Sequence, residues 1–464
     1  MWYLTTARAH GVILMVAIRN SERLSISERA GMMTAGEAAD QLGVKLGTLY
    51  AYVSRGWLKS YRRKVGRQAL YRRADIEALR GVVSTERGRR GRSLPAASTW
   101  VTVAQPKSID EGAPGVIVAE SAVSSINEGK LAYRGYPIEE IVAHASFEEV
   151  CLLLWSGDRP VSEEIAALRA EIQGAQMPAS VADALAAVGD DAPPLLRLAA
   201  VMPVFAAWDR RQPPRTRIDR AKLIISQLPL ALAQPPAPGP PNGPGMAGRL
   251  LGWVPGSAAS DWEVEALDRV LAACAEHELN ASTFAARVVA STGADLFASV
   301  LSALCSLSGP IHGGACDRIE AMFAELETGA RVEECLASFT REHRLPPGFG
   351  HAIYPDGDPR AALLRQVAQT IAKRRGRRLF ETAIKVESAV SKRERLRPNL
   401  DFYLTVCVRM LGFPRSMPAA IFAIGRASGW IAHALEQYAD NRLIRPRMRY
   451  RGAPLRHWEQ PSHA

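Results

Sequence analysis

The chain has 464 residues, of which 47% are hydrophobic and 23% are charged, and its formal net charge is +11. This composition is ordinary for a globular protein with a substantial core, and the length favours two or three domains. The apolar run at residues 11–18 is far shorter than the roughly 20 residues that cross a bilayer, which excludes a membrane span there, and it lacks a cleavage site typical of a signal peptide.

The six cysteines are scattered along the chain without CxxC pairs. This spacing argues against a zinc site and against the disulfide framework of a secreted protein. We therefore expect free thiols, no bound metal and a cytoplasmic location.

Residues 34–42 predict a short amphipathic helix. Thr34 is a good N-cap and Glu37 follows three residues later, as in a capping box, while Gly43 is suited to end the helix. The face expected to be buried consists of Ala38, Ala39 and Leu42.

Residues 46–56 predict a second helix, residues 58–71 a β-hairpin wing that turns near Gly66, and residues 72–80 a third helix. This order resembles the helix-turn-helix domain of MerR-type regulators and excisionases. We assign residues 33–82 to this small winged domain. Residues 1–32 are left as an N-terminal extension to which no function is assigned.

Positive charge is concentrated in this part of the chain. Residues 55–92 include thirteen Lys or Arg against three acids, an excess of +10. In the family that the module resembles, the second helix enters the major groove and the wing contacts phosphates. The resemblance implies DNA contacts by Lys45, Thr48, Tyr50, Tyr52, Arg55, Arg62, Arg63, Lys64 and Arg67. A solvated basic face on a packing module is the alternative, because only the charge indicates a ligand.

Residues 83–112 predict a linker, since they are rich in Arg, Gly, Ser, Pro and Ala. Beyond it the chain predicts a mainly α fold, with Ala- and Leu-rich helical stretches at 163–172, 182–188, 195–207 and 264–275. Two segments differ: residues 115–136 predict a small hairpin that turns at 127–129, and the proline-rich residues 235–245 predict a surface loop.

Three segments near the C-terminal end contain the candidate catalytic residues. They are SGPIHGGA around His312, GFGHAIYPDGDPR around His351 and RPNLDFY around Asp401. Two imidazoles in glycine-rich backbone and one carboxylate are suited to removing a proton from carbon beside a carbonyl while polarising a second carbonyl. The segments are far apart, so only a folded domain brings them together.

These three segments resemble segments of the citrate synthase family. So do residues 131–160, EHELN at 276–280 and FAIGRASGWIAHALEQY at 422–438, and all of them occur in the same order as in the family. The resemblance extends from about residue 113 to 451. The resemblance implies a large domain of residues 113–312 and 413–464 and a hinged small domain of residues 313–412. It also implies condensation of acetyl-CoA with oxaloacetate, then thioester hydrolysis to citrate and coenzyme A.

The resemblance implies a role for each group. Asp401 would be the base, His312 would bind the thioester carbonyl and His351 would polarise the ketone. His277, Arg360, Arg426 and Arg445 would hold the dicarboxylate, because arginine matches carboxylate oxygens in a fork. In the family, the residue that matches Arg445 reaches into the neighbouring subunit, which implies a homodimer or a higher oligomer.

No permanently bound cofactor is expected, and coenzyme A enters as a co-substrate. Its phosphates have two candidate partners, the basic cluster at 373–375 or the one that includes Lys392, Arg393, Arg395 and Arg397, and either could be a solvated helix face. Gly348 and Gly350 are expected to shape the loop over the coenzyme.

The chain departs from many family members beside the base. Cys316-Asp317 replaces Asn-Glu, and Leu404-Thr405 replaces Ser-Gly. Two questions stay open on the sequence: propionyl-CoA is an alternative acyl donor that would give 2-methylcitrate, and the chain could instead be a DNA-binding regulator that uses the synthase body as a metabolite sensor.

Overall fold

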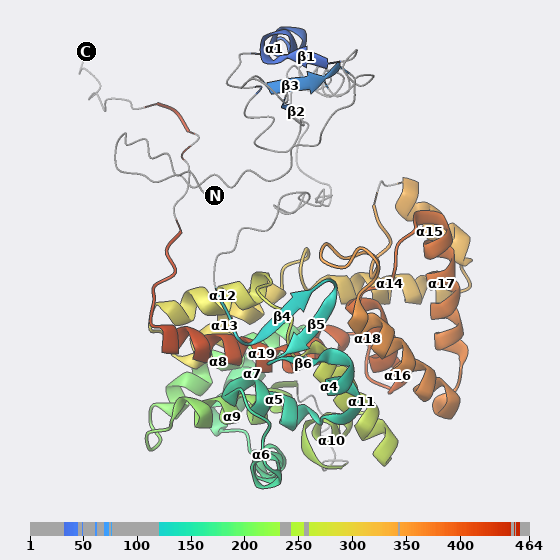
Figure 1. Ribbon diagram of the computed structural model, residues 1–464. Helices are drawn as coiled ribbons and strands as arrows, with labels where there is room; N and C mark the ends of the chain where they lie inside the picture. Colours follow the sequence, from blue (N-terminus) through green and yellow to red (C-terminus); the bar gives the residue numbers. More distant parts are fainter. Residues whose placement is uncertain are drawn as a thin grey trace, which may run out of the picture. The chain divides into compact units, whose positions relative to one another are not determined.

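The computed structural model describes residues 32–44, 49, 61–62, 69–73, 76, 120–232, 243–254, 259–341, 344–446, 450 and 452–454. Contacts divide the chain into two compact units, Met1–Val116 and Ile117–Ala464. Figure 1 labels the helices and strands of both units.

The first unit contains β1 (Met32–Thr34), α1 (Ala35–Leu42), β2 (Tyr61–Arg62) and β3 (Ala69–Arg72). The expected capping box is present, with the Thr34 amide donating to Glu37 Oε2 at 2.7 Å. Gly43 ends α1 with φ 65°, a left-handed conformation that favours glycine. The predicted face of α1 is buried against Leu49, Tyr71 and Ile76. The prediction for this helix is confirmed.

The strands form an antiparallel sheet in the order β1-β3-β2. Tyr61 pairs with Leu70 and Arg62 with Ala69, as expected for the predicted wing. Met32, which we placed in the extension, pairs with Arg72 as the first residue of β1, and Met33 is only 3% exposed. The sequence did not predict this third strand, because a three-residue strand has no periodicity of its own.

Most of the candidate DNA contacts lie outside the described residues: Lys45, Thr48, Tyr50, Tyr52, Arg55, Arg63, Lys64 and Arg67. The backbone of Arg62 is described, in β2. Leu49 is helical and fully buried, in agreement with its expected place on the second helix. The linker and the tip of the proline-rich loop also lie outside the described residues.

The second unit begins with a small antiparallel sheet of β4 (Ser124–Asn127), β5 (Lys130–Tyr133) and β6 (Tyr136–Pro137). The predicted hairpin is confirmed: Asn127 pairs with Lys130, and Glu128 and Gly129 both have positive φ, as in the primed turns that match the twist of the strands.

The rest of the second unit is helical, as predicted. Its elements are α4 (Ile138–His144), α5 (Phe147–Ser156), α6 (Ser162–Gly174), α7 (Ala179–Val188), α8 (Pro194–Asp209), α9 (Arg217–Gln227), η2 (Leu228–Leu232), α10 (Gly245–Leu251), α11 (Asp261–Cys274), α12 (Ala281–Ser291), α13 (Leu296–Leu307), α14 (Ala315–Glu327), α15 (Val332–Arg341), α16 (Pro359–Arg375), α17 (Arg378–Glu394), α18 (Leu400–Met410) and α19 (Pro418–Asp440).

Helix α19 is the centre of this unit and is buried along most of its length. It packs against α5, α11, α12 and α13. A Cβ at Gly425 would lie 2.8 Å from the Cys274 Cβ, and one at Gly429 would lie 2.2 Å from Glu276 Oε2. These two glycines therefore let α19 approach the end of α11, and they place Arg426 between them deep in the core.

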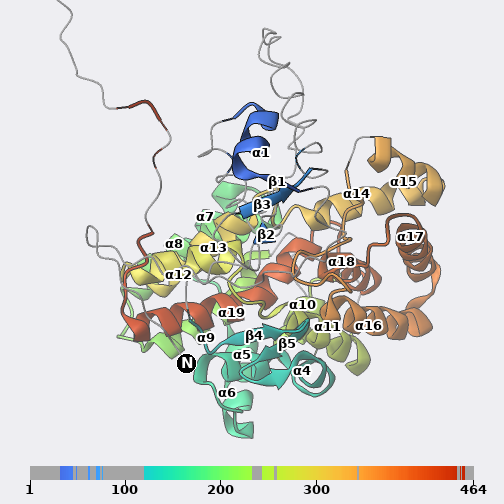
Figure 2. The ribbon, with the colours of Figure 1, turned by 45° about the horizontal axis from the view of Figure 1, so that its top comes forward.

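Helices α14 to α18 gather on one side of the second unit, away from α8, α12 and α13 (Figures 1 and 2). Helix α16 packs against α18 and α11, so this group rests on the central helices. In the part of the chain that the structure describes, no helix is long and apolar enough to span a membrane. All six cysteines are free thiols.

Candidate active site

Backbone pairing holds the His351 segment against the turn that precedes Asp401. The Gly350 amide donates to the Arg397 carbonyl at 2.9 Å, and the Asn399 amide donates to the Gly348 carbonyl at 2.9 Å. Gly348 has φ 83°, and a Cβ there would lie 2.9 Å from the Cβ of Phe402. Its glycine is therefore required by packing beside α18, whereas coenzyme contacts by Gly348 and Gly350 stay a prediction.

Asp358 ties these segments together and was not among the residues predicted from the sequence. Its carboxylate accepts from the Arg360 amide and from the Leu400 amide, each at 3.0 Å. The Arg360 guanidinium also forms a fork on it, with Nε to Oδ1 at 3.0 Å and Nη2 to Oδ2 at 2.8 Å. The Arg360 side chain is 4% exposed and the Asp358 side chain is fully buried. The predicted clamp residue Arg360 is thus already paired within the chain.

His277 and His351 lie side by side, with ring centroids 5.1 Å apart. His277 is 5% exposed, and its Nε2 lies 2.9 Å from the Tyr354 hydroxyl. Tyr354 is buried and packs on both rings. Tyr354 belongs to the segment that we quoted around His351, yet its spacing alone gave no sign of this contact.

His312 lies in the turn before α14, and its ring is anchored on α12. Nε2 is 2.9 Å from the Ser282 hydroxyl oxygen, and Trp430 Nε1 of α19 donates to the same oxygen at 3.1 Å. Ser282 is fully buried and its hydroxyl also lies 2.8 Å from Asn280 Oδ1. The α12 and α19 segments therefore fix the orientation of the imidazole.

All three imidazoles are neutral at physiological pH. Burial, followed by the charge of Arg426, lowers the pKa of His312 to about 4. Burial, followed by the charge of Arg360, lowers the pKa of His351 to about 4 and the pKa of His277 well below its ordinary value. His351 Nδ1 accepts from the Ile353 amide at 3.2 Å, so the ring proton resides on Nε2. That atom is available as a donor.

Asp401 is the second residue of α18 and lies at the helix start. Burial raises the pKa of its carboxyl, against the lowering effect of Arg360 and Arg426. A carboxylate that is poorly stabilised in this way is a stronger base than a solvated one.

Arg426 lies at the centre of these groups and is 1% exposed. Its Nε donates to the Cys274 carbonyl at 2.6 Å, whereas its buried Nη2 has no hydrogen-bond partner among the described residues. A buried guanidinium nitrogen without an acceptor costs free energy unless an anion fills the place. The geometry therefore leaves an open position for a carboxylate.

Among the residues that it describes, the structure shows no contact between the remaining predicted residues and the histidines, arginines and carboxylates described above. Arg445 is exposed beyond the end of α19 and makes no hydrogen bond or ion pair with any residue that the structure describes. Lys392 and Arg393 are exposed in the last turn of α17, where Arg393 pairs with Glu394 at 3.3 Å. Within the described ranges, no group of three or more His, Cys, Asp or Glu is arranged to hold a metal ion.

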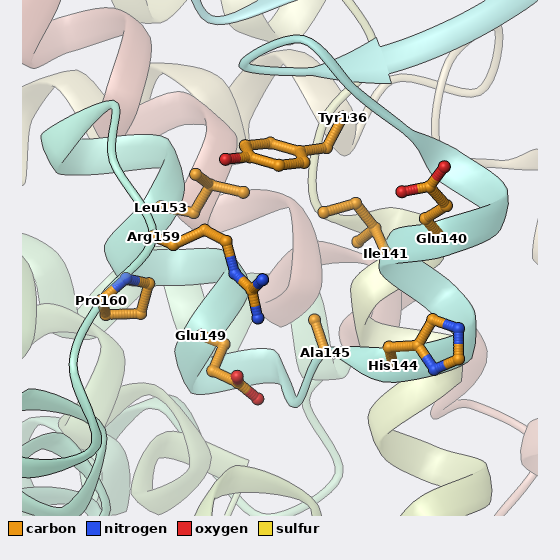
Figure 3. Close-up of a pocket in the computed structure, with 9 residues that line it drawn as sticks. All are labelled: Tyr136, Glu140, Ile141, His144, Ala145, Glu149, Leu153, Arg159 and Pro160. Atoms are coloured by element: carbon orange, nitrogen blue, oxygen red, sulfur yellow. The ribbon is translucent and has the colours of Figure 1, made fainter.

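A separate cavity of about 330 Å³ lies between β6, α4 and α5 (Figure 3). None of the candidate site residues lines it. Its walls combine the carboxylates of Glu140 and Glu149 with the guanidinium of Arg159 around an apolar floor. Because the walls carry charges of both signs, they do not indicate whether a ligand would be an anion or a cation.

A mainly α body that surrounds neutral imidazoles, a partly buried carboxylate and a buried guanidinium with one unpaired nitrogen is suited to acid–base chemistry. The model of the citrate synthase C-terminal domain matches residues 112–447, and a helix-turn-helix domain model matches residues 32–80. The chain belongs to the citrate synthase family, so it is a transferase that uses an acyl-CoA as a substrate and needs no permanently bound cofactor.

Relatives in this family carry two different names. Citrate synthase 2 of Bacillus subtilis is 33% identical over 356 residues, which cover 74% of this chain and 95% of that protein. The 2-methylcitrate synthase 1 of Corynebacterium glutamicum is 30% identical over 370 residues, or 75% and 96% of the two chains. A citrate synthase of Thermoplasma acidophilum, solved with carboxymethyl coenzyme A and oxaloacetate, is 28% identical with a TM-score of 0.67, covering 75% and 97%.

Proposed function

We propose that the chain condenses acetyl-CoA with oxaloacetate and then hydrolyses the thioester to citrate and coenzyme A. The observation that carries this proposal is Arg426, whose buried Nη2 has no partner in the described chain and is therefore open to a substrate carboxylate. Arg360 and His277 complete the dicarboxylate site.

The reaction then follows from the arrangement of the groups. The Asp401 carboxylate takes a proton from the methyl carbon of the thioester, and His312 donates a hydrogen bond to the oxygen on which negative charge develops. In the structure the single proton of the Ser282 hydroxyl is donated to Asn280 Oδ1. His312 becomes the donor to the thioester through Nδ1 only when this hydroxyl turns to donate to Nε2, which places the ring proton on Nδ1. The carbon nucleophile attacks the ketone carbon that His351 Nε2–H polarises, and water cleaves the resulting thioester.

Two features of the assembly belong to this proposal. Residues 313–412, which include α14 to α18, would act as the small domain that closes over the substrates and excludes water until the carbon–carbon bond has formed. Arg445, which is exposed and unpaired in the described part of the chain, would enter the site of a second copy in a homodimer. Five buried free thiols fit a reducing cytoplasm.

The acyl donor is tested by comparing acetyl-CoA with propionyl-CoA on the purified full chain. We expect the larger kcat/KM with acetyl-CoA, by about 10- to 200-fold, because one methylene in a fitted pocket changes binding by about 1–3 kcal/mol. Coenzyme release is best followed by chromatography, since the exposed Cys305 would react with a thiol reagent. A larger kcat/KM with propionyl-CoA would assign the chain to 2-methylcitrate synthesis.

We propose DNA binding as a second function of the N-terminal unit. It is supported by the helix-turn-helix match over residues 32–80 and by the +10 charge excess of residues 55–92. A regulator with a synthase body as its metabolite sensor would need this binding, whereas a simple enzyme would not.

Charge reversal of Arg62 and Arg63 to Glu in the full chain tests this function. If both contact phosphates, the slope of log K against log salt in a mobility-shift titration should become less negative by about 2, since each lost phosphate contact removes about 0.9. Reversal of the exposed pair Arg377 and Arg378 is the matched control. Equal salt slopes for the two variants would reject phosphate contact by the wing.

A further inference from the structure

The base of the proposed reaction has a thiol neighbour. Cys316 is the second residue of α14, Asp401 is the second residue of α18, and these two helices pack together. Cys316 Sγ donates to Asp401 Oδ1 across 3.8 Å, and the thiol is 3% exposed. Burial raises the pKa of Cys316 well above its ordinary value, so the thiol keeps its proton and acts as a donor.

No other hydrogen-bond donor reaches the Asp401 carboxylate from the residues that the structure describes. A thiol is a weak donor, and it neutralises little of the carboxylate charge. A hydroxyl or amide at the same place would form a stronger charge-assisted hydrogen bond and would stabilise the ionised carboxylate more. The choice of donor at position 316 therefore affects the strength of the base.

Thr405 is a second neighbour of Asp401 and also lies near the thiol. Thr405 lies one helical turn after Asp401, is fully buried, and donates through Oγ1 to the Asp401 carbonyl at 2.8 Å. The same side chain is close enough to the Cys316 thiol to lower its pKa, although burial raises that pKa more. Thr405 and Cys316 therefore both lie next to Asp401.

We propose that Cys316 is a positioning residue for the base: its thiol holds Oδ1, leaves Oδ2 to face the substrate, and weakens the base less than a hydroxyl or amide donor at the same place would. The inference rests on the proposed function, in which Asp401 removes the proton. Cys316 acts through Asp401 and need not touch the substrate.

The charged and titratable groups around Asp401 come from every element packed against it. They are Asp358 and Arg360 at the start of α16, Arg426 on α19, Cys316 on α14 and Cys274 on α11. The guanidiniums keep their charge and the thiols keep their protons at neutral pH. Arg360 lowers the pKa of Asp358 below its ordinary value despite burial. His312 and His351, each with a pKa of about 4, also titrate in the acidic range. The quantity that reports Asp401 is therefore the shift of the acidic limb that the Cys316 variants cause relative to the wild type.

The test compares Cys316→Ser with Cys316→Ala in the full chain. The acidic limb of kcat/KM should shift to lower pH in the serine variant, by roughly one unit, because the stronger donor stabilises the carboxylate. It should shift to higher pH in the alanine variant, which lacks a donor. Opposite shifts separate this role from a merely structural one, which would move neither limb.

A second readout isolates the proton transfer. Exchange of the α-carbon protons of acetyl-CoA and propionyl-CoA with D₂O is followed in the presence of malate, a dicarboxylate that cannot condense. Both variants should exchange more slowly than the wild type, the serine variant because its base is weaker and the alanine variant because its base is less well oriented. Thermal melting verifies that each variant is folded.

Cys335→Ser is the matched control. Cys335 is also buried, at 1% exposure, and its thiol donates to Glu325 Oε2 across 3.6 Å, outside the candidate site. This variant should retain the wild-type profile. Asp401→Asn in the same exchange assay separates the two claims: if it is inactive while both Cys316 variants match the wild type, the Cys316 proposal is wrong, and if it exchanges normally, the proposed function is wrong.

Discussion

Asp401→Asn is expected to lower turnover by about 10²- to 10⁴-fold, the contribution of a positioned general base. The amide cannot accept the methyl proton, and no neighbour is free to replace the carboxylate. The nearby carboxylate of Asp358 raises the pKa of Asp401. The oxygens of Asp358, however, already accept hydrogen bonds from Arg360 and from the Leu400 amide. The measurement is steady-state coenzyme release at saturating oxaloacetate.

The same variant should not be less stable at neutral pH. Burial raises the pKa of Asp401 in the folded chain, so the folded state binds this proton more tightly than the unfolded state does. The stability from this group is therefore present at low pH and lost as the pH rises through the folded pKa. At pH 7 the neutral amide removes a charge that is poorly solvated in this partly buried position, and the melting temperature should equal or exceed that of the wild type.

Asp183→Asn, at an exposed position on α7, is the control for the amide substitution and should leave turnover unchanged. Near-wild-type turnover by Asp401→Asn would contradict the assignment of the base. A large fall in melting temperature would show instead that the carboxylate is structural.

Arg426→Met is expected to lower kcat/KM for oxaloacetate by about 30-fold to several thousand-fold. This range corresponds to about 2–5 kcal/mol, the usual cost of removing one partner of a buried charged hydrogen bond. The open Nη2 of Arg426 is the group that would pair with the substrate carboxylate. The mutation also removes a charge that lowers the pKa of His312, although burial remains the larger cause.

Ligand-dependent melting separates binding from folding in this variant. Oxaloacetate should raise the melting temperature of the wild type, because a ligand that binds only the folded state stabilises it, and it should not raise that of Arg426→Met. Arg287→Met is the contrast: Arg287 is equally buried, but its guanidinium is paired with Glu436 at 2.5 Å and with Gln437 at 3.0 Å.

Arg287→Met should lower the melting temperature of the free protein more than Arg426→Met does, and it should still respond to oxaloacetate. The melting temperature falls because the loss of the Arg287 guanidinium leaves the oxygens of Glu436 and Gln437 without their donor. If Arg426→Met responded to oxaloacetate as the wild type does, the clamp role of Arg426 would be wrong.

Local features of the fold were predictable from the sequence. The Thr34–Glu37 capping box, the turn at Glu128 and Gly129 and the long α helices depend on residues three or four positions apart or on single turns. The strand β1 was not predictable, because Met32–Thr34 become a strand only through pairing with β3 across about forty residues.

The sequence by itself determined which chemical groups are available: His312, His351, Asp401 and the arginines stand in recognisable segments whose residue types indicate acid–base chemistry on a carboxylated substrate. Only the tertiary structure decided which of these groups have a hydrogen-bond partner within the chain. It pairs Arg360 with Asp358, leaves Nη2 of Arg426 without a partner among the described residues, and directs the Cys316 thiol to the Asp401 carboxylate. Hydrogen bonds and burial between helices depend on packing across the whole chain, and those contacts, rather than residue spacing, decide which charge is satisfied and which awaits a ligand.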